Sequence, residues 1–282
     1  MRILVLGSTG MLGHMAFRVL SKNRNFKVEG TQLEDQNAPY YFNAEDSIKK
    51  EFDKYDYLIN CIGILSSGIK AGDSISAARA IKINALFPHQ FAKLVKGKII
   101  HISTDGVFSG KAENYNEESS HDCLDIYGKT KSLGEVVADN VLNIRTSIIG
   151  PSPIKKQGLF EWFMAQPEGE VINGYVNHIW NGVTTLQFAE LCAKIIKEDV
   201  FCELRNKSSV FHFSPNCPVT KYELLSIFKI VFKKDVIINP VEDPGGPVIR
   251  ILKTKYEGLK RLFPHGGAME SAIQELKDFI YA

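Results

Sequence analysis

A tyrosine and a lysine, Tyr127 and Lys131, lie four positions apart near the expected start of a helix. Residues with this spacing share one helix face, so both side chains can reach the same ligand. A free phenol titrates near pH ~10, and a nearby ammonium stabilises the phenolate. We therefore expect Lys131 to lower the pKa of Tyr127 until the phenol can exchange a proton near neutral pH. The hydroxyl of Thr104, which follows a separate apolar run, could hold a carbonyl oxygen in line with this phenol.

A glycine-rich stretch near the N-terminus could bind the cofactor that this chemistry requires. It runs from Gly7 to Gly13 as GSTGMLG, between an apolar run of strand length and a helical pattern. Gly7 would allow the tight turn, Gly10 would let the backbone approach a pyrophosphate, and Gly13 would let the helix pack close to the strand. A nicotinamide dinucleotide held there would supply a hydride to the carbonyl carbon.

The choice between NAD and NADP is made at the end of the second strand of such a fold. We expect that strand at residues 26–31. Glu29 is slightly too early to bind the ribose, Thr31 and Gln32 are neutral, and no arginine follows immediately. These residues leave both cofactors open.

Strands and helices alternate up to residue 150, which predicts a doubly wound parallel sheet of the α/β class, covered on both faces. We expect a polar, mobile loop at 65–76 and another polar loop at 111–125. Asn84 falls inside a helical pattern, where an asparagine is usually solvated. The expected strands are 2–6, 26–31, 40–43, 57–64, 98–102 and 140–149, and the expected helices are 14–22, 45–53, 77–95 and 127–138.

The alternation breaks after Pro151, and a smaller C-terminal α/β domain is expected to form one wall of a cleft. We assign residues 1–150 and 183–215 to the dinucleotide-binding domain, and 151–182 and 216–282 to the substrate domain. Val210 to Phe213 would return to the main sheet, and 243–247 would break the chain. Further helices are expected at 159–165, 184–197, 221–232 and 269–281, and further strands at 170–180 and 236–239.

Bulk composition places the chain among ordinary globular proteins and excludes several classes. The 282 residues are 44% hydrophobic and 23% charged, with a net charge of +2, which gives no electrostatic case for nucleic acid or an anionic membrane. No apolar stretch could span a membrane and no signal peptide is visible, so we expect a cytoplasmic protein. Five scattered cysteines without a C-x-x-C pair indicate reduced thiols, and no metal site is expected.

Five motifs together resemble the extended short-chain dehydrogenase/reductases, and within them the dTDP-4-dehydrorhamnose reductase group. The turn GSTGMLG is followed by STDGVFSG at 103–110, similar to S-T-D-Y-V-F-x-G, and by YGKTKSLGE at 127–135, similar to Y-G-x-[ST]-K-x-x-G-E. RTSIIG at 145–150 and NGVTTLQFAEL at 181–191 resemble later family segments. The matches span nearly the whole chain and imply a Rossmann fold.

The resemblance implies a role for each site residue. Tyr127 would be the acid, Lys131 its modulator and a ribose ligand, and Thr104 the hydroxyl that orients the carbonyl. Thr104, Asp105 and Arg250 would bind substrate, with Arg250 at a position resembling one that binds diphosphate. The cofactor, NADP or NAD with a slight preference for NADPH, would meet Tyr127 and Lys131 together with Gly7, Thr9, Gly10, Met11, Leu12, Gly13, Asn43, Cys61, Ile62 and Gly63.

The implied reaction is the reduction of a 4-keto-6-deoxy sugar carried on a nucleoside diphosphate, a step of bacterial surface polysaccharide biosynthesis. Gly106 and Ile148 replace the tyrosine and tryptophan that are usual in the family. Smaller side chains there would leave space for an acetamido group, so a UDP-linked N-acetylated 6-deoxyhexose is an alternative to a dTDP-linked sugar. A homodimer is common in the superfamily.

Two other functions stay open. A nucleotide-sugar epimerase shares the tyrosine and lysine but consumes no net cofactor. A cofactor-binding regulatory subunit would bind NADP without turnover, although the intact Thr104, Tyr127 and Lys131 argue against it. A 4,6-dehydratase is disfavoured because Gly106 stands where its second acid would follow Asp105. Trp180, Asn181 and Lys221 could also meet substrate, but core or surface roles are favoured for these three.

Overall fold

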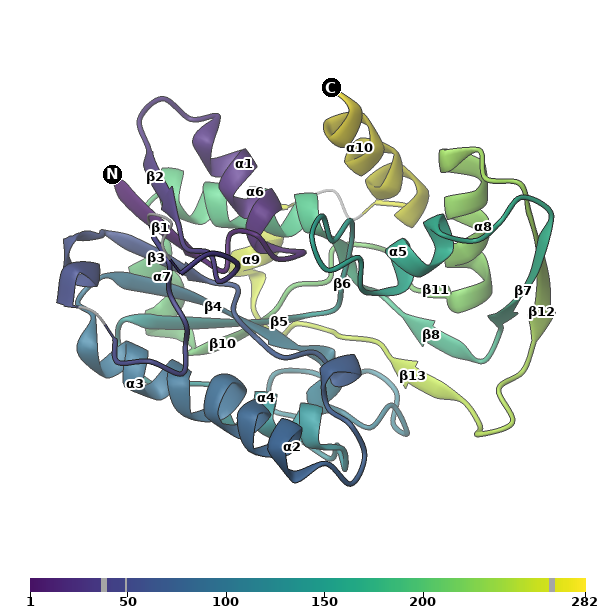
Figure 1. Cartoon of the computed structure of the whole chain (residues 1–282), viewed down its shortest axis with the longest axis horizontal. Helices are drawn as coiled ribbons and strands as arrows, with labels where there is room; N and C mark the ends of the chain where they lie inside the picture. The colour runs from purple at the N-terminus through teal and green to yellow at the C-terminus, as the bar shows by residue number, and fades with distance from the viewer. Residues whose placement is uncertain (37–39, 49, 264–266) are drawn as a thin grey trace.

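The computed structural model describes residues 1–36, 40–48, 50–263 and 267–282. Its central feature is a six-stranded parallel sheet in the order β10-β5-β4-β3-β1-β2 (Figure 1). The strands are β1 (Arg2–Leu6), β2 (Lys27–Gly30), β3 (Tyr57–Asn60), β4 (Lys98–Thr104), β5 (Val141–Thr146) and β10 (Val210–His212). The order reverses beside β1, and ligands of open α/β sheets bind outside the carboxyl ends of the strands at such a point.

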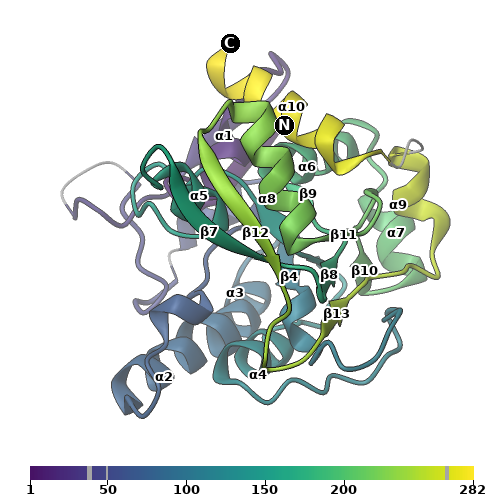
Figure 2. The same cartoon turned by 90° about the vertical axis from the view of Figure 1, so that its right-hand side faces the viewer.

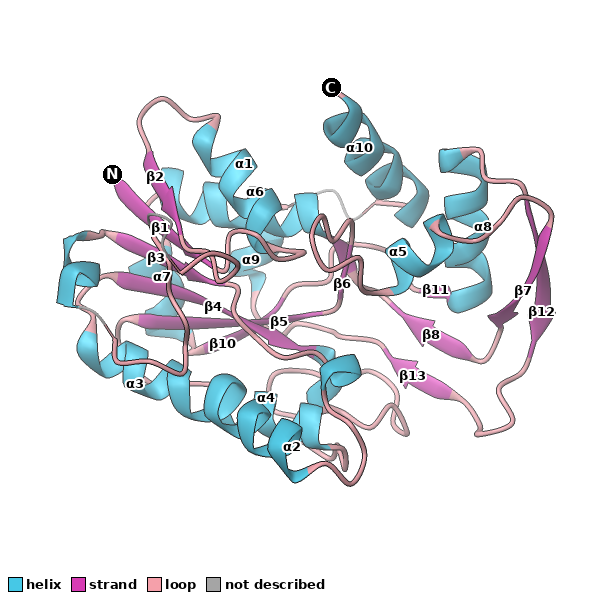
Figure 3. Cartoon of the chain, viewed as in Figure 1, coloured by secondary structure: helices cyan, strands magenta, loops and turns pink. Residues whose placement is uncertain are grey.

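Helices cover both faces of this sheet, as the alternation predicted (Figure 3). Alternate residues of β1 show why: Ile3 and Val5 join one hydrophobic core, whereas Leu4 and Leu6 join the other. The first core lies under α1 (Gly13–Ser21), α6 (Thr185–Lys197) and α7 (Phe201–Lys207). The second lies under α3 (Phe87–Leu94), and the helices α2 (Ser74–Ala80) and α4 (Ile126–Leu133) lie on the same side.

A smaller α/β unit stands at the carboxyl ends of the strands. It holds a three-stranded sheet, β11 (Val219–Thr220), β8 (His178–Trp180) and β13 (Val248–Arg250), and the parallel pair β7 (Glu170–Tyr175) and β12 (Val236–Val241). Its core is formed by α5 (Leu159–Met164), α8 (Lys221–Phe232) and α10 (Met269–Tyr281), and Figure 2 shows α8 beside the β7–β12 pair. The short strands β6 (Ile148–Ile149) and β9 (Val183–Thr184) and the helix α9 (Glu257–Leu262) complete the chain.

Two expectations in the region 40–53 are wrong. In the described part of that region, Tyr41 makes only an isolated bridge with Gln32, and the helical residues are limited to the short 3-10 turn η1 (Lys50–Lys54). The aromatic residues pack instead of pairing in a sheet: the Phe42 ring lies 5.1 Å from that of Phe52 and 5.7 Å from that of Phe87. A short apolar segment that packs into a core without pairing has the same hydrophobic pattern as a short strand.

Several boundaries also differ from the sequence prediction. The segment expected as one strand at 140–149 is divided into β5 and β6, and the segment expected at 170–180 is divided into β7 and β8. Helix α2 begins inside the expected loop 65–76, which also holds the 3-10 turn η2 (Ser66–Gly68). The break at 243–247 is confirmed, between β12 and β13. None of the described helices is long and apolar enough to cross a membrane.

Candidate active site

The glycine turn joins β1 to α1 in the tight form that was expected. Gly7 has a φ of +72°, and a Cβ at Gly13 would lie 2.0 Å from the Gly7 carbonyl oxygen, so neither position accepts a side chain. The end of β2 is fastened to this turn, because Gly7 N donates to Thr31 Oγ1 at 2.9 Å and Ser8 N donates to the Thr31 carbonyl at 2.8 Å.

This turn fits a dinucleotide. No side chain caps the N-terminus of α1, so the amide groups of its first turn can donate to an anionic pyrophosphate. A Cβ at Gly10 would meet only the Gly7 carbonyl within 4 Å, so the backbone there is open to a ligand. Of the expected cofactor residues, Asn43 is tied to its own loop by accepting from Glu45 N at 3.0 Å.

The segment after β3 connects the glycine turn to the expected catalytic lysine. A Cβ at Gly7 would lie 3.2 Å from Ile62 Cγ1 and 3.7 Å from the Cys61 carbonyl. Burial raises the pKa of the Cys61 thiol to about 12, and the Lys131 ammonium opposes this rise. The segment after β3 therefore contacts the glycine turn and lies within electrostatic range of Lys131, and an elongated dinucleotide could follow it.

Tyr127 and Thr104 meet at Gly106. A Cβ at Gly106 would lie 3.0 Å from Tyr127 Cε1 and 3.3 Å from Thr104 Oγ1, so the phenol ring and the hydroxyl share one small space. Local capping creates this geometry: Gly106 N donates to Thr104 Oγ1 at 3.0 Å, and Gly128 N donates to Asp125 Oδ1 at 2.9 Å at the start of α4.

The two titrating groups of α4 are shifted by burial. Burial lowers the pKa of Lys131 to about 8, and Glu135 opposes this change. The Lys131 ammonium donates to the Ile102 carbonyl at 2.7 Å, which fixes it against β4. Burial raises the pKa of Tyr127 to about 12, with a further rise from Asp105 and an opposing effect from Thr104. The expected lowering of the tyrosine pKa is therefore wrong for the protein alone.

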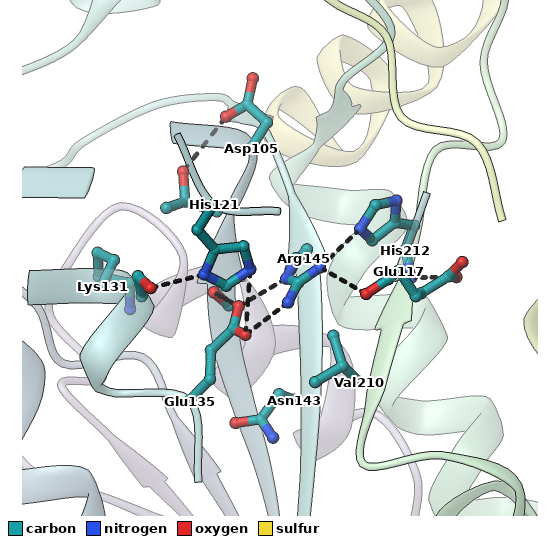
Figure 4. Close-up of polar contacts among 12 residues, drawn as sticks. Asp105, Glu117, His121, Lys131, Glu135, Asn143, Arg145, Val210 and His212 are labelled. Atoms are coloured by element: carbon teal, nitrogen blue, oxygen red, sulfur yellow. Dashed lines mark hydrogen bonds and ion pairs between the residues drawn. The ribbon is translucent and has the colours of Figure 1, made fainter. Parts of the chain in front are cut away.

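A buried polar network connects β4, β5 and the segment that follows α4 (Figure 4). Arg145 donates two hydrogen bonds of 2.7 Å to the Glu135 carboxylate, and Ser103 Oγ donates to the same group at 2.6 Å. Arg145 also lies 3.2 Å from Nε2 of His212. Burial would raise the pKa of Glu135, but the Arg145 guanidinium outweighs it and the pKa is lowered. Ser103 directly precedes Thr104, so the network fixes the end of β4 that carries Thr104.

Asn84 is a positioning residue that the sequence prediction missed. Its side chain is buried, accepts from Ile64 N at 2.8 Å, and donates to the Ile64 carbonyl at 2.9 Å and to Thr130 Oγ1 at 3.2 Å. It lies in the π-helical segment η3 (Ile81–Leu86), between α2 and α3. Such segments are frequent at functional sites. Asn84 thus joins the loop after β3 to α4.

Two cations of the smaller unit, Lys221 and Arg250, form a charged cluster with Asp105 at the end of β4. The Asp105 carboxylate is buried, which raises its pKa, while Arg250 and Lys221 oppose the rise. Burial lowers the pKa of Lys221 to about 8, and its ammonium lies 4.7 Å from the Trp180 ring centroid. Arg250 pairs with Trp180 across β13 and β8, and Nε of Arg250 and Nε1 of Trp180 are buried without a hydrogen-bond partner. Buried donors without a partner are rare in proteins, so these two groups are candidates for contact with a ligand.

The sequence analysis favoured core or surface roles for Trp180, Asn181 and Lys221. Lys221 belongs to the charged cluster, whereas Asn181 does not. Asn181 is structural, since it donates to the Leu252 carbonyl at 2.8 Å and accepts from Leu252 N at 2.9 Å. Lys221 lies within electrostatic range of Asp105 and Arg250. Its position as the first residue of α8, after the capping residue Thr220, is the only sequence signal for it.

Comparison with known proteins places the chain in a family. The family described as RmlD substrate binding domain matches residues 1–247. The chain belongs to this family. The match includes the glycine turn, the Thr104 strand end and α4, so the resemblance inferred from the motifs is confirmed at the level of the family.

Solved structures confirm the fold over the full length. A dTDP-4-dehydrorhamnose reductase from Clostridium acetobutylicum is similar with a TM-score of 0.77 and 20% identity, covering 100% of both chains. One from Bacillus anthracis, in complex with NADP, gives a TM-score of 0.74 and 18% identity over 100% of this chain and 99% of that chain. Methionine adenosyltransferase 2 subunit beta from Danio rerio is 23% identical over 87% of this chain and 79% of that protein.

No three or more His, Cys, Asp and Glu side chains gather into a possible metal site within the described ranges. The five cysteines are free thiols.

Proposed function

We propose that the protein is an NAD(P)H-dependent reductase of a 4-keto-6-deoxy sugar carried on a nucleoside diphosphate. The observation that carries the proposal is the shared space of Thr104 and Tyr127 at Gly106, joined through Lys131 and Cys61 to a turn that fits a dinucleotide. Membership of the RmlD substrate binding domain family supports a nucleotide sugar as the substrate.

The chain's own groups would handle the proton of this reaction. Bound NADH or NADPH would supply the hydride to the carbonyl carbon. The Thr104 hydroxyl would donate a hydrogen bond to the carbonyl oxygen, and the Tyr127 phenol would transfer its proton to that oxygen. Because Tyr127 is protonated at neutral pH, it is ready to act as an acid. The Lys131 ammonium would then stabilise the phenolate.

The charged cluster of Asp105, Lys221 and Arg250 would bind the rest of the substrate. The two cations and the orphan Nε of Arg250 suit the diphosphate or an acceptor oxygen on the sugar, and the Asp105 carboxylate suits a sugar hydroxyl. The glycine at position 106, where the family usually has tyrosine, affects Tyr127, because a Cβ there would point at the phenol ring. Both a dTDP-linked sugar and a UDP-linked N-acetylated 6-deoxyhexose therefore belong in the substrate screen.

We also propose the division of the chain into a dinucleotide-binding domain at 1–150 and 183–215 and a substrate domain at 151–182 and 216–282. The place of β10 in the main sheet and the packing of α6 on α1 support it. The free cysteines support a cytoplasmic location, because disulfides are rare in that compartment.

The test is a screen of dTDP- and UDP-linked 4-keto sugars that follows the oxidation of NADH and NADPH by absorbance. We expect stoichiometric oxidation with at least one sugar. Tyr127→Phe should lower kcat by roughly a hundredfold or more, because general acid catalysis is lost. Tyr222→Phe, a tyrosine on α8 outside the proposed catalytic group, is the matched control. Oxidation that Tyr127→Phe leaves unchanged would contradict the assignment.

The same screen separates the two alternatives. An epimerase would interconvert a nucleotide sugar without net cofactor oxidation. A non-catalytic subunit would bind the cofactor without turnover, and the likeness to an adenosyltransferase subunit from Danio rerio is the observation that favours it. Thr104, Tyr127 and Lys131 are all present and clustered, which supports the reductase.

A further inference from the structure

A carboxylate lies directly against the glycine turn. Thr9 Oγ1 donates to both oxygens of Glu34, at 3.0 and 3.1 Å, and Leu33 N donates to the same carboxylate at 3.0 Å. Glu34 is four residues beyond the end of β2, past the positions where the sequence analysis looked for a ribose ligand. The bifurcated hydrogen bond from Thr9 holds the carboxylate at the turn, and the bond from Leu33 N fixes its orientation.

A dinucleotide bound at the glycine turn would place its ribose beside Glu34. The end of β2 is fastened to the turn through Thr31, and Glu34 extends this edge to Thr9. In dinucleotide-binding folds the ribose beside the adenine lies where the end of the second strand meets the glycine turn. This step rests on the proposed function, which places a nicotinamide dinucleotide at the turn.

Within the described residues 28–36 and 40–48, no cationic side chain is present to balance an additional phosphate. Residues 28–48 contain no lysine or arginine but five acids, Glu29, Glu34, Asp35, Glu45 and Asp46. Two cations that reach this region are already paired, Lys54 with Glu29 at 3.3 Å and Arg79 with Glu45 at 3.0 Å. A 2′-phosphate carries close to two negative charges, and it would stand against the Glu34 carboxylate.

We propose that Glu34 is a specificity-determining residue that makes the protein prefer NADH to NADPH. Its carboxylate accepts a hydrogen bond from the ribose 2′-hydroxyl and repels a phosphate at that oxygen. Thr9 holds the carboxylate in place. This proposed preference is the opposite of the slight preference for NADPH expected from the sequence.

The test measures binding rather than turnover, on the intact chain without sugar. NADH and NADPH are titrated separately, and binding is followed by the fluorescence of the reduced nicotinamide at low salt. We expect NADH to bind about tenfold more tightly or better, and higher ionic strength to narrow the gap. Glu34→Gln keeps the size of the side chain and removes its charge, so it should tighten NADPH binding and reduce the preference to about threefold or less.

Two further variants test whether the cofactor preference depends on the charge at position 34. Asp35→Asn removes the same charge one residue away and should leave the preference for NADH within about twofold of the wild-type value. Glu34→Arg should reverse the preference, because an arginine can pair with a 2′-phosphate.

The outcomes separate this inference from the proposed function. Equal affinities, tighter binding of NADPH by the wild type, or an unchanged preference in Glu34→Gln would overturn the role of Glu34 while leaving the reductase intact. Failure to bind either nucleotide would overturn the dinucleotide site, and the proposed function with it.

Discussion

Gly106 controls how close the phenol of Tyr127 lies to the hydroxyl of Thr104. The absence of a side chain lets the Tyr127 ring approach the end of β4 more closely than a Cβ would allow. Catalysis by positioned groups is sensitive to displacements of this size. The glycine therefore belongs to the proposed catalytic geometry, although it carries no reactive atom.

Gly106→Ala should lower kcat by roughly tenfold and change KM little, because the added Cβ would lie 3.0 Å from Tyr127 Cε1 and displace the ring. Steady-state kinetics with the sugar found in the screen measure this. Gly267→Ala is the control, since a Cβ there would meet nothing within 4 Å. A kcat equal to that of the wild type would show that the displacement of the ring has no catalytic effect.

The pH dependence of reduction should report Lys131. Its pKa of about 8 means that the ammonium is lost as the pH rises through that value, while Tyr127 with a pKa of about 12 keeps its proton. We expect kcat at saturating sugar to fall tenfold per pH unit above about pH 8, a measurement to which the binding residue Lys221, whose pKa is also about 8, contributes little. Lys131→Arg cannot deprotonate in this range, so its profile should be flat even if its rate is lower. A wild-type profile that stays level up to about pH 10 would exclude this role.

Lys221→Met should raise KM for the nucleotide sugar by roughly tenfold to a hundredfold and leave kcat within about threefold, because it removes a charge from the binding cluster and not from the reacting carbonyl. Methionine keeps an apolar stem against Trp180. Lys229→Met, a lysine on the exposed side of α8, is the matched control. Equal KM values for Lys221→Met and wild type would remove Lys221 from the site.

At the scale of elements, the buried ion pair between Arg145 and Glu135 joins β5 to the segment after α4. Both side chains are at most 7% exposed, so each charge depends on the other for its solvation. Removing one partner of such a pair is strongly destabilising, whereas replacing both with neutral groups is tolerated much better.

Arg145→Met should reduce the free energy of unfolding by ~3–5 kcal/mol, and adding Glu135→Gln should recover a large part of that loss. Denaturant unfolding of the wild type, the single variant and the double variant measures both effects. The pKa of Glu135 is lowered in the folded protein, so the stabilisation by this pair is present above the unfolded pKa near ~4.3 and is lost as the pH falls through the lower folded value. A double variant no more stable than Arg145→Met would contradict this account.

The sequence could predict those elements whose signal is local. The strand β1, the glycine turn and α1 follow from an apolar run, three glycines and a helical pattern, and the structure contains all three. The sequence prediction missed regions whose structure depends on contacts between residues that are distant in the sequence. Phe42 packs against other aromatic rings instead of forming a strand, and β13 is only three residues long and depends on β8 for its pairing. The partners of Asn84 lie 20 and 46 residues away, so no local pattern could reveal its role.

At the scale of the whole molecule, His212 couples the main sheet to the C-terminal segment. Nδ1 of His212 lies 2.9 Å from the Lys253 carbonyl and Nε2 lies 3.2 Å from Nη1 of Arg145. A carbonyl only accepts and a guanidinium only donates, so the neutral ring with its proton on Nδ1 satisfies both partners. Glu117 strengthens the same junction, since it accepts from His212 N at 2.9 Å and from Lys255 N at 3.0 Å.

The protein should lose stability on acidification over the range in which His212 titrates. Burial lowers the pKa of His212 to about 4, and the negative charge of Glu117 opposes this change. Between the two pKa values the unfolded chain therefore binds a proton that the folded protein does not. This stabilisation is complete above the unfolded pKa near ~6.5 and is lost as the pH falls towards about 4. Thermal unfolding between about pH 7 and 4 measures it. His212→Gln should flatten the slope and His89→Gln, at an exposed position, should not; identical slopes would show that His212 is not responsible.

The π-helical segment around Asn84 makes the spacing of its helix critical. A π-helical turn contains one residue more than an α-helical turn, so deleting a single residue between Ile81 and Leu86 would restore regular α-helical winding and remove the wide turn that places Asn84. The side chain that now reaches both Ile64 and Thr130 would then lose this position. The loop beside the proposed nicotinamide path and the helix that carries Tyr127 and Lys131 would lose their common anchor, although no proposed catalytic residue had changed.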